Sequence, residues 1–324
     1  NESGHKFKNL PSGKELYIQL VEKVRAKLPD HGEWIIIPDG PLCQLPFESL
    51  PIGNNATGML ESIAISYEFS TRSMLQRSVT SAGRDYRVLS FAPFSEITNR
   101  NGRWQPLPAS LQEVSGVRGA IYSGKQATRK RFLDEINKFP VVHLATHAYA
   151  DVENPGASFV AFYEGDEDNL ETRLYLEELY GLRMDSTQLV IISACETGEG
   201  QIASGEGALS LSRGFAYAGA ASSVSSLWNA DDQSTAFILS KFHQYLRNGY
   251  SKPVALQRAR LDYIASNDLA KTPNYWSHLI LIGDSSPLSP GQNRYFWLYV
   301  ISGAYISLIS VMITRKFLAR KKYR

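Results

Sequence analysis

The sequence predicts an α/β fold in which a mostly parallel β-sheet is covered by helices on both faces. Residues 128–284 alternate short apolar runs of strand length with longer amphipathic stretches of helical length. The apolar runs are continuous, which is typical of strands that are buried on both faces. The chain has 324 residues and is 43% hydrophobic, so it can bury a large core as one domain or as two.

The first part of the chain, residues 1–84, is expected to contribute a helix, two strands and an ordered loop. Residues 14–28 place apolar side chains four positions apart, as on one side of a helix. The run at 33–40 ends in a Pro-Asp-Gly turn, and residues 62–70 alternate as a strand does. In the loop between them we interpret Cys43 as a small apolar filler.

The second part of the chain, residues 85–288, carries the regular alternation of strands and helices. Its expected order is strand, helix, helix, strand, hairpin, short helix, strand, helix, strand, two helices and a final strand. The strands are residues 87–93, 141–146, 189–193, 221–228 and 278–284, and the hairpin is residues 158–176. The helices are residues 110–121, 128–139, 176–182, 206–220, 232–249 and 253–266.

Two of the most apolar predicted strands lead into chemically reactive residues. The run at 141–146 is followed by His147, and the run at 189–193 is followed by Ala194 and Cys195. If the two strands are neighbours, about 4.8 Å apart, both side chains emerge at the same edge of the sheet. An imidazole there can take the thiol proton and make the cysteine a nucleophile near neutral pH.

Simpler interpretations exist for Cys195 and for a second histidine, His143. A cysteine after a buried strand is often only a small apolar side chain of the core. His143 precedes His147 by four residues, which in a strand span about 13 Å, too far for both to bind one metal ion. We therefore expect His143 to be a core histidine or one that supports the site, and we expect neither a metal nor a cofactor.

Several longer stretches are distinctive as a set. They are VVHLATHA at 141–148, IISACETGEG at 191–200, GEGALSLSRGFAYAGA at 205–220 and SSLWNADDQSTAFILSKF at 225–242. Together they resemble the CHAT domain family of caspase-like cysteine peptidases, which are related to caspases and separases. WIIIPDGPLCQLPFESL at 34–50 resembles the opening segment of the family, so the resemblance extends over roughly residues 15–285. The interval of about 50 residues between the histidine and the cysteine also suits the caspase order.

The resemblance implies a catalytic dyad of His147 and Cys195. In the family, the thiolate attacks the scissile carbonyl to give an acyl-enzyme, and the histidine protonates the leaving amine. The backbone N–H groups of Cys195 and of the residue after the histidine would hold the oxyanion. That residue is usually glycine, and here it is Ala148, whose Cβ is a disadvantage if the position needs a positive φ or a close approach of the substrate.

The relation to separases implies an acidic residue, after the strand at 221–228, that binds a basic substrate side chain before the cut. Asp232 is the first candidate for this role and Asp231 is the second. The same pair precedes a predicted helix, where an acidic side chain is favoured as the N-cap. Substrate specificity and helix capping are therefore both open for these two residues.

The C-terminal segment differs from the rest of the chain. Residues 295–314 contain no charged residue or histidine and are about as long as the roughly 20 residues that a helix needs to cross a bilayer. Aromatic side chains are concentrated in the first turns, as in an interfacial belt. We predict a single transmembrane helix, with a buried C-terminal helix as the alternative. Residues 315–324 form a basic tail, which the positive-inside tendency puts in the cytoplasm with the body exported, whereas a tail anchor inserted after translation gives the opposite topology.

These features predict a membrane-anchored cysteine endopeptidase that acts on a protein or peptide substrate. Without the basic residues of the tail, the formal charge of +2 becomes −4, which argues against a nucleic-acid partner. Because the chain begins at Asn1 without a targeting segment, we expect it to be the end of a longer bacterial polypeptide. The resemblance implies an upstream tetratricopeptide-repeat region as a partner. The alternative is a catalytically silent CHAT pseudo-peptidase that acts as a membrane-tethered interaction or signalling module.

Overall fold

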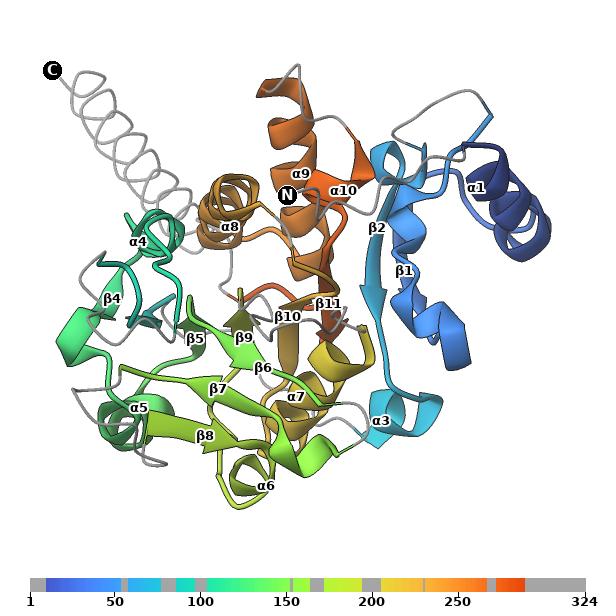
Figure 1. Cartoon of the computed structure of the whole chain (residues 1–324). Coiled ribbons are helices and arrows are strands. Elements are labelled where there is room, and N and C mark those ends of the chain that lie inside the picture. The colour runs from blue at the N-terminus through green and yellow to red at the C-terminus, as the bar shows by residue number, and fades with distance from the viewer. Residues whose placement is uncertain are drawn as a thin grey trace, which may run out of the picture.

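Eight strands form one sheet in a computed structural model that describes residues 10–53, 58–76, 86–96, 104–151, 154–163, 172–193, 205–229, 231–266 and 272–288. The order in the sheet is β1–β2–β11–β10–β9–β5–β3–β4 (Figure 1). All neighbours run parallel except β10 and β11, so the prediction of a mostly parallel sheet is confirmed. The strands are β1 (Gly32–Ile36), β2 (Ile63–Tyr67), β3 (Val88–Ala92), β4 (Gly119–Ser123), β5 (Val141–Leu144), β9 (Leu189–Ile192), β10 (Ser222–Ser226) and β11 (Leu279–Gly283).

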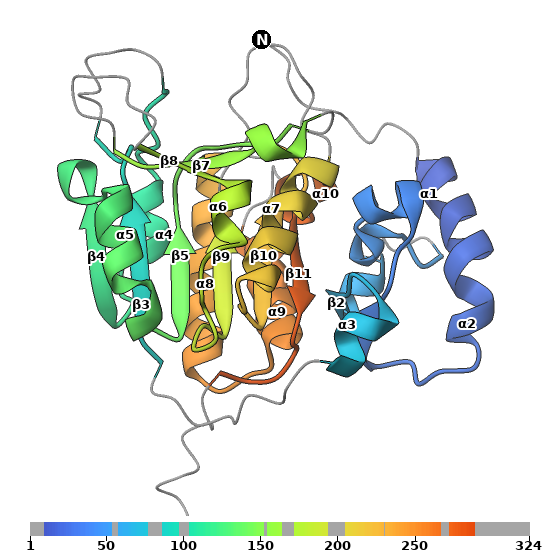
Figure 2. The same cartoon turned by 90° about the horizontal axis from the view of Figure 1, so that it is seen from below.

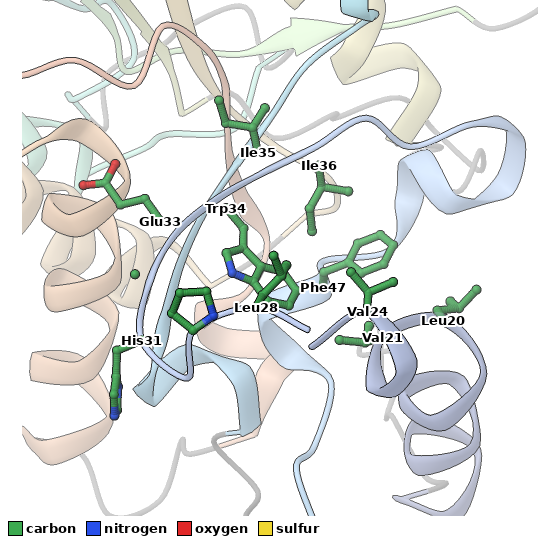
Figure 3. Close-up of a pocket in the computed structure, with 12 residues that line it drawn as sticks. Leu20, Val21, Val24, Leu28, His31, Glu33, Trp34, Ile35, Ile36 and Phe47 are labelled. Carbon is green, nitrogen blue, oxygen red and sulfur yellow. The ribbon is translucent and has the colours of Figure 1, made fainter. Parts of the chain in front are cut away.

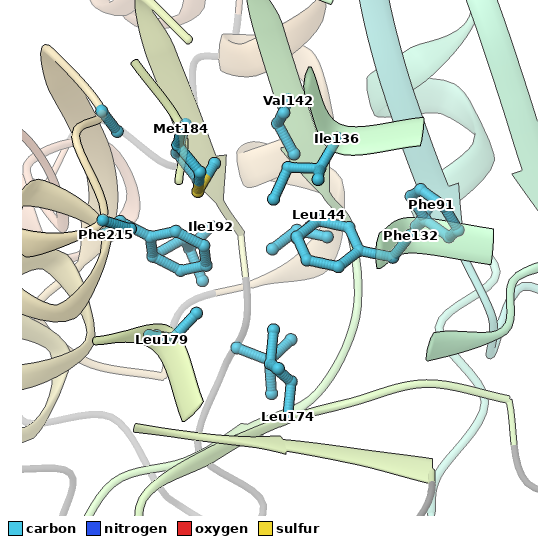
Figure 4. Close-up of a cluster of buried hydrophobic side chains, with 14 of the residues drawn as sticks. Phe91, Phe132, Ile136, Val142, Leu144, Leu174, Leu179, Met184, Ile192 and Phe215 are labelled. Carbon is cyan, nitrogen blue, oxygen red and sulfur yellow. The ribbon is translucent and has the colours of Figure 1, made fainter. Parts of the chain in front are cut away.

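Helices cover both faces of this sheet, as Figure 2 shows. One face carries α5 (Arg129–Glu135), α6 (Leu176–Leu179) and α7 (Gly205–Tyr217), and the other carries α4 (Ser110–Val114), α8 (Asp232–Arg247), α9 (Lys252–Ser266) and α10 (Pro273–Trp276). Alternate strand residues serve the two layers: Val142 packs with the α5 and α7 side chains shown in Figure 4, and Val141 packs with those of α8 and α9. The central strands are buried on both sides, which explains their continuous apolar sequence.

The N-terminal residues extend the same sheet. β1 pairs with β2, and β2 pairs with β11, so the sheet ends at β1 on this side. The helix expected at 14–28 is built as α1 (Leu10–Tyr17), a π-helical turn (Ile18–Glu22) and α2 (Lys23–Arg25), and α3 (Thr71–Gln76) follows β2. Cys43 packs against this part of the core, with its Sγ 3.6 Å from the carbonyl oxygen of Pro38, in agreement with its interpretation as filler.

A buried ion pair ties the N-terminal residues to the helix layer. Arg260 of α9 lies 2.7 Å from a carboxylate oxygen of Glu48, and both side chains are almost fully buried. The hydroxyl of Tyr67 donates to the other carboxylate oxygen at 2.5 Å, and burial raises the pKa of this tyrosine. The guanidinium of Arg260 also donates to the carbonyl of Leu279 in β11. These bonds join β2, β11 and α9 where the two parts of the sheet meet.

A second, antiparallel sheet of three short strands follows β5. It consists of β6 (Ala148–Tyr149), β7 (Phe159–Ala161) and β8 (Arg173–Tyr175), in that order. Figure 2 shows β7 and β8 across one end of the large sheet. The hairpin predicted at 158–176 is confirmed, and β6 is an addition that the sequence did not indicate, because two residues give no alternation to read.

Other stretches differ from the prediction. The helix expected at 110–121 ends at Val114, and the residues from Gly119 form the edge strand β4. β4 is half exposed, so its composition lacks the apolar run that marks the central strands. Short 3₁₀ turns fill several connections: Gly40–Gln44, Phe47–Ser49, Gly58–Glu61, Gly124–Gln126, Ile136–Lys138 and Pro155–Ala157.

The predicted membrane helix falls on residues 295–314, which lie outside the described residues. Among the described helices, none has both the length and the apolar composition needed to cross a bilayer. The boundary expected between residues 84 and 85 also lies outside the described ranges.

Candidate active site

His147 lies just beyond the carboxyl end of β5, in a fully buried aromatic setting. Its ring stacks on the indole of Trp104, with ring centroids 5.1 Å apart and planes 18° apart, and it lies 4.8 Å from the ring of Phe94. Nε2 is 2.7 Å from the carbonyl oxygen of Gln105. A carbonyl can only accept, so Nε2 carries the hydrogen, and in the neutral ring Nδ1 carries the lone pair.

The charge state of His147 follows from these contacts. Burial lowers the pKa of the imidazole, and the hydrogen bond to the Gln105 carbonyl partly offsets this effect. The ring is therefore neutral near pH 7 and is able to accept a proton. The bond from the N–H of Leu107 to the carbonyl of Phe94, 2.7 Å long, fixes the loop that carries Trp104 and Gln105 against the end of β3.

Ala148 is the first residue of β6 and pairs with Val160 of β7. The N–H of Ala161 donates to the carbonyl of His147 at 2.9 Å, which makes Ala148 and Val160 a non-hydrogen-bonded pair of the ladder. In such a pair the backbone N–H points away from the partner strand. No described non-glycine residue has a positive φ, so Ala148 adopts its conformation without needing glycine.

The two strands that precede the predicted dyad are direct neighbours. β5 and β9 pair in parallel, with Leu144 opposite Ile192. The pairing continues one residue further, where the N–H of Ser193 donates to the carbonyl of Leu144 at 3.2 Å. His147 and Cys195 each follow three positions after a member of the Leu144–Ile192 pair. Cys195 itself, predicted as nucleophile and as an oxyanion donor, lies outside the described residues.

Asp231 and Asp232 have different surroundings at the start of α8. Asp231 is the N-cap, because its carboxylate accepts from the N–H of Ser234 at 2.9 Å and its carbonyl accepts from the N–H of Thr235 at 3.0 Å. Asp232, the first residue of the helix, is half-buried. Burial raises its pKa, and the negative charges of Glu113 and Asp231 add to the effect.

A chain of buried polar side chains lies behind the ends of β5 and β9. The hydroxyl of Tyr86 bonds to Nδ1 of His243, whose Nε2 lies 2.8 Å from Nδ1 of His143. Nε2 of His143 lies 3.0 Å from Oε2 of Glu113, which also accepts from the hydroxyl of Ser193. His143 is thus a buried histidine with polar partners at both ring nitrogens, and whether it supports the site stays a prediction. Sequence reasoning missed the other members, because Glu113 lies between Gln112 and Val114 and carries no local signal of burial.

An apolar cavity of about 640 Å³ lies elsewhere in the molecule (Figure 3). It opens between the π-helical turn Ile18–Glu22, α2 and the edge strand β1, and its walls include Val21, Val24 and Trp34. The residues that line it include none from the segments around His147 or Asp232. In the described part of the chain, no group of three or more His, Cys, Asp or Glu side chains is arranged to hold a metal ion.

Known proteins similar to this chain include two tetratricopeptide-repeat proteins. Tetratricopeptide repeat protein 28 of Mus musculus is 24% identical over 221 residues, and the protein of that name in Homo sapiens is 22% identical over 303 residues. These matches cover 57% and 80% of this chain. The chain spans only 9% and 12% of the length of these relatives.

Solved structures that are similar to this chain include two protein complexes. The complex of Porphyromonas gingivalis RgpB pro- and mature domains has a TM-score of 0.48 at 10% identity and covers 87% of this chain and 69% of that chain. The Saccharomyces cerevisiae separase–securin complex has a TM-score of 0.45 at 9% identity, and the match covers 74% of this chain and 15% of that chain. The family model of the CHAT domain matches residues 10–284, which is most of the sequence and nearly all of the described fold. The chain therefore belongs to the CHAT domain family.

Proposed function

We propose that this protein is a membrane-anchored cysteine endopeptidase that uses His147 and Cys195 as a dyad. The observation that carries the proposal is the pairing of β5 with β9, in which Leu144 lies opposite Ile192. Side chains three positions further along two adjacent parallel strands emerge at one edge of the sheet, where ligands of such sheets bind. The family membership of the chain supports the same chemistry.

The contacts of His147 suit the role of general base and then general acid. With Nε2–H donating to Gln105, the lone pair on Nδ1 takes the thiol proton of Cys195. The thiolate attacks the scissile carbonyl carbon, and a C–S bond forms as the carbonyl becomes an oxyanion. When the intermediate collapses, the C–N bond breaks and Nδ1–H protonates the leaving amine. A water molecule, deprotonated by the same nitrogen, then hydrolyses the thioester and restores the thiol.

The backbone provides the oxyanion donors in this proposal. The N–H of Ala148 points away from β7 and is not used by the ladder, so it is available to the oxyanion together with the N–H of Cys195. Asp232 is the proposed specificity residue, because Asp231 already serves as the cap and Asp232 is half-buried beside it. A carboxylate in that place favours Arg or Lys before the cut.

Cleavage profiling of a peptide library by the whole chain in detergent tests the enzymatic proposal. We expect cuts that disappear in Cys195→Ala and in His147→Ala, while Cys43→Ala, the matched change at the other cysteine, cuts as the unchanged chain does. Cuts that survive Cys195→Ala would refute the dyad. If the unchanged chain cleaves no peptide under any condition, the result would favour the non-enzymatic interaction module.

Membrane attachment is proposed for residues 295–314, with the basic tail 315–324 in the cytoplasm and the body on the other side. The relatives named for tetratricopeptide repeats, of which the chain spans only a small part, support an upstream repeat region as the partner that selects a protein substrate. Protease accessibility in intact cells tests the topology, because an exported body is cut from outside and a tail-anchored one is protected.

A further inference from the structure

The carboxyl group of Glu113 lies in an apolar layer, and hydrogen bonds hold it there. It lies on α4 with only 5% of its surface exposed, facing β5 and α8. Burying such a group without partners is costly, so its position depends on the hydrogen bonds that it accepts. Both of its described donors, His143 and Ser193, contact the same oxygen, Oε2.

One assignment of hydrogens satisfies the whole polar chain. Tyr86 donates to Nδ1 of His243, Nε2–H of His243 donates to Nδ1 of His143, and Nε2–H of His143 donates to Glu113. Each imidazole donates once and accepts once, so both are neutral. Burial supports this state, because it lowers the pKa of His143 to about 3 and that of His243 well below its ordinary value. The chain of bonds therefore ends on the Glu113 carboxyl, where Ser193 donates to the same oxygen and its Oγ lies 3.4 Å from Nε2 of His143.

The elements joined at Glu113 are those that lead to the proposed site. Ser193 directly follows β9 and precedes Cys195 by two residues, and His143 belongs to β5, which leads to His147. α8, which supplies His243, begins at Asp232. One side chain thus contacts β5 and the residue that directly follows β9, and a hydrogen-bond chain links it to the helix of the proposed specificity residue.

We propose that Glu113 is a positioning residue of this protein: by accepting from both Ser193 and His143, it fixes the carboxyl end of β9 relative to β5 and so sets where Cys195 lies with respect to His147. The inference rests on the proposed function. A displacement of about 1 Å between reacting groups lowers the reaction rate by about 100-fold. Loss of these two bonds therefore lowers reactivity even when the fold persists.

The test uses the whole chain with Glu113→Ala, Glu113→Gln and Ser193→Ala. Two quantities are measured on each variant: the rate of iodoacetamide alkylation at Cys195, resolved from Cys43 by peptide mass spectrometry, and kcat and KM on a cleaved peptide. We expect Glu113→Ala to lower the alkylation rate and kcat by about 10- to 100-fold with KM within about twofold. Glu113→Gln, which keeps the hydrogen bonds, restores most of the loss.

A matched control separates positioning from stability. Glu48→Gln changes another buried glutamate that lies against Arg260, and it lowers the unfolding temperature while leaving the alkylation rate of the folded protein unchanged. A folded Glu113→Ala protein with unchanged alkylation and kcat overturns the inference. If that variant does not fold, Ser193→Ala decides by the same two quantities. If the unchanged chain cleaves nothing, the proposed function fails, and the alkylation rates alone still judge whether Glu113 positions Cys195.

Discussion

The imidazole of His147 donates its Nε2 hydrogen to the carbonyl oxygen of Gln105, 2.7 Å away. The bond selects the tautomer and leaves Nδ1 as the basic nitrogen. The stacked indole of Trp104 keeps the ring buried in this orientation. A backbone carbonyl thus orients the histidine, and the burial of the ring sets its basicity.

Trp104→Ala should raise the pKa of His147. Burial is the main cause that lowers this pKa, so water that enters beside the ring moves the value back toward the ordinary 6.5. A protonated ring does not accept the thiol proton, and the acid limb of the pH profile of Cys195 alkylation therefore shifts to higher pH. Trp104→Phe keeps an aromatic cover and should retain the original profile. An acid limb that stays in place in Trp104→Ala would contradict this account of the ring.

Ala148→Gly should leave the cleavage rate within about threefold, because φ at this position is already compatible with a side chain. Ala148→Pro removes the N–H that the ladder does not use. It should therefore keep the fold, as circular dichroism would verify, while kcat falls by about 100- to 1,000-fold, as for other oxyanion donors. Full activity of a folded Ala148→Pro protein would exclude this N–H from the oxyanion site.

Asp231 and Asp232 should respond in opposite ways. Asp231→Ala removes the N-cap of α8 and should lower the free energy of unfolding by about 1 kcal/mol, without changing the residue preferred before the cut. Asp232→Asn should keep the stability and abolish the preference for Arg or Lys. Denaturant unfolding and cleavage-site profiling of the two variants measure the contrast. A preserved preference in Asp232→Asn would remove this residue from the substrate site.

The pair of Glu48 and Arg260 should be important for stability. Glu48→Gln leaves the buried guanidinium without its counter-charge, and the free energy of unfolding should fall by about 3–5 kcal/mol. The exposed pair of Lys130 and Asp134 provides the comparison, since Lys130→Ala should leave the free energy of unfolding nearly unchanged. Equal effects in chemical denaturation would show that the buried pair does not hold β2, β11 and α9 together.

Glu113 should make the stability depend on pH in a defined direction. Burial raises its pKa from the ordinary 4.5 to about 8, so between these values the folded state binds more protons than the unfolded state. Stability contributed by this group is complete below pH 4.5 and is lost as the pH rises toward 8, by up to about 1.4 kcal/mol for each pH unit. His143 acts in the opposite direction below pH 6.5, because burial lowers its pKa.

Comparison with Glu113→Gln isolates this contribution. The other groups that interact with Glu113, namely His143, His243, Tyr86 and Asp232, are present in both proteins. We expect the stability difference between the unchanged chain and the variant to fall steadily from pH 5 to 8 and to level off above. A difference that is constant over this range would show that Glu113 does not titrate as its burial implies.

The sequence was sufficient to predict the sheet and the segments around the site. Continuous apolar runs identified β5 and β9 as central strands, and their pairing placed the residues before His147 and Cys195 side by side. The aromatic setting of His147 was not predictable, because Trp104 and Gln105 lie in a loop that has no periodic pattern. Glu113 and His243 meet His143 only through the packing of α4 and α8, and such contacts between distant helices leave no local signal.

The most direct test of the central claim is covalent trapping of the nucleophile. The whole chain is treated with a lysine- or arginine-directed acyloxymethyl ketone peptide, and the adduct is located by peptide mass spectrometry. We expect one adduct, on Cys195, that is lost in His147→Ala and weakened in Asp232→Asn. An adduct on Cys43, or a Cys195 adduct that forms equally fast in His147→Ala, would contradict the dyad.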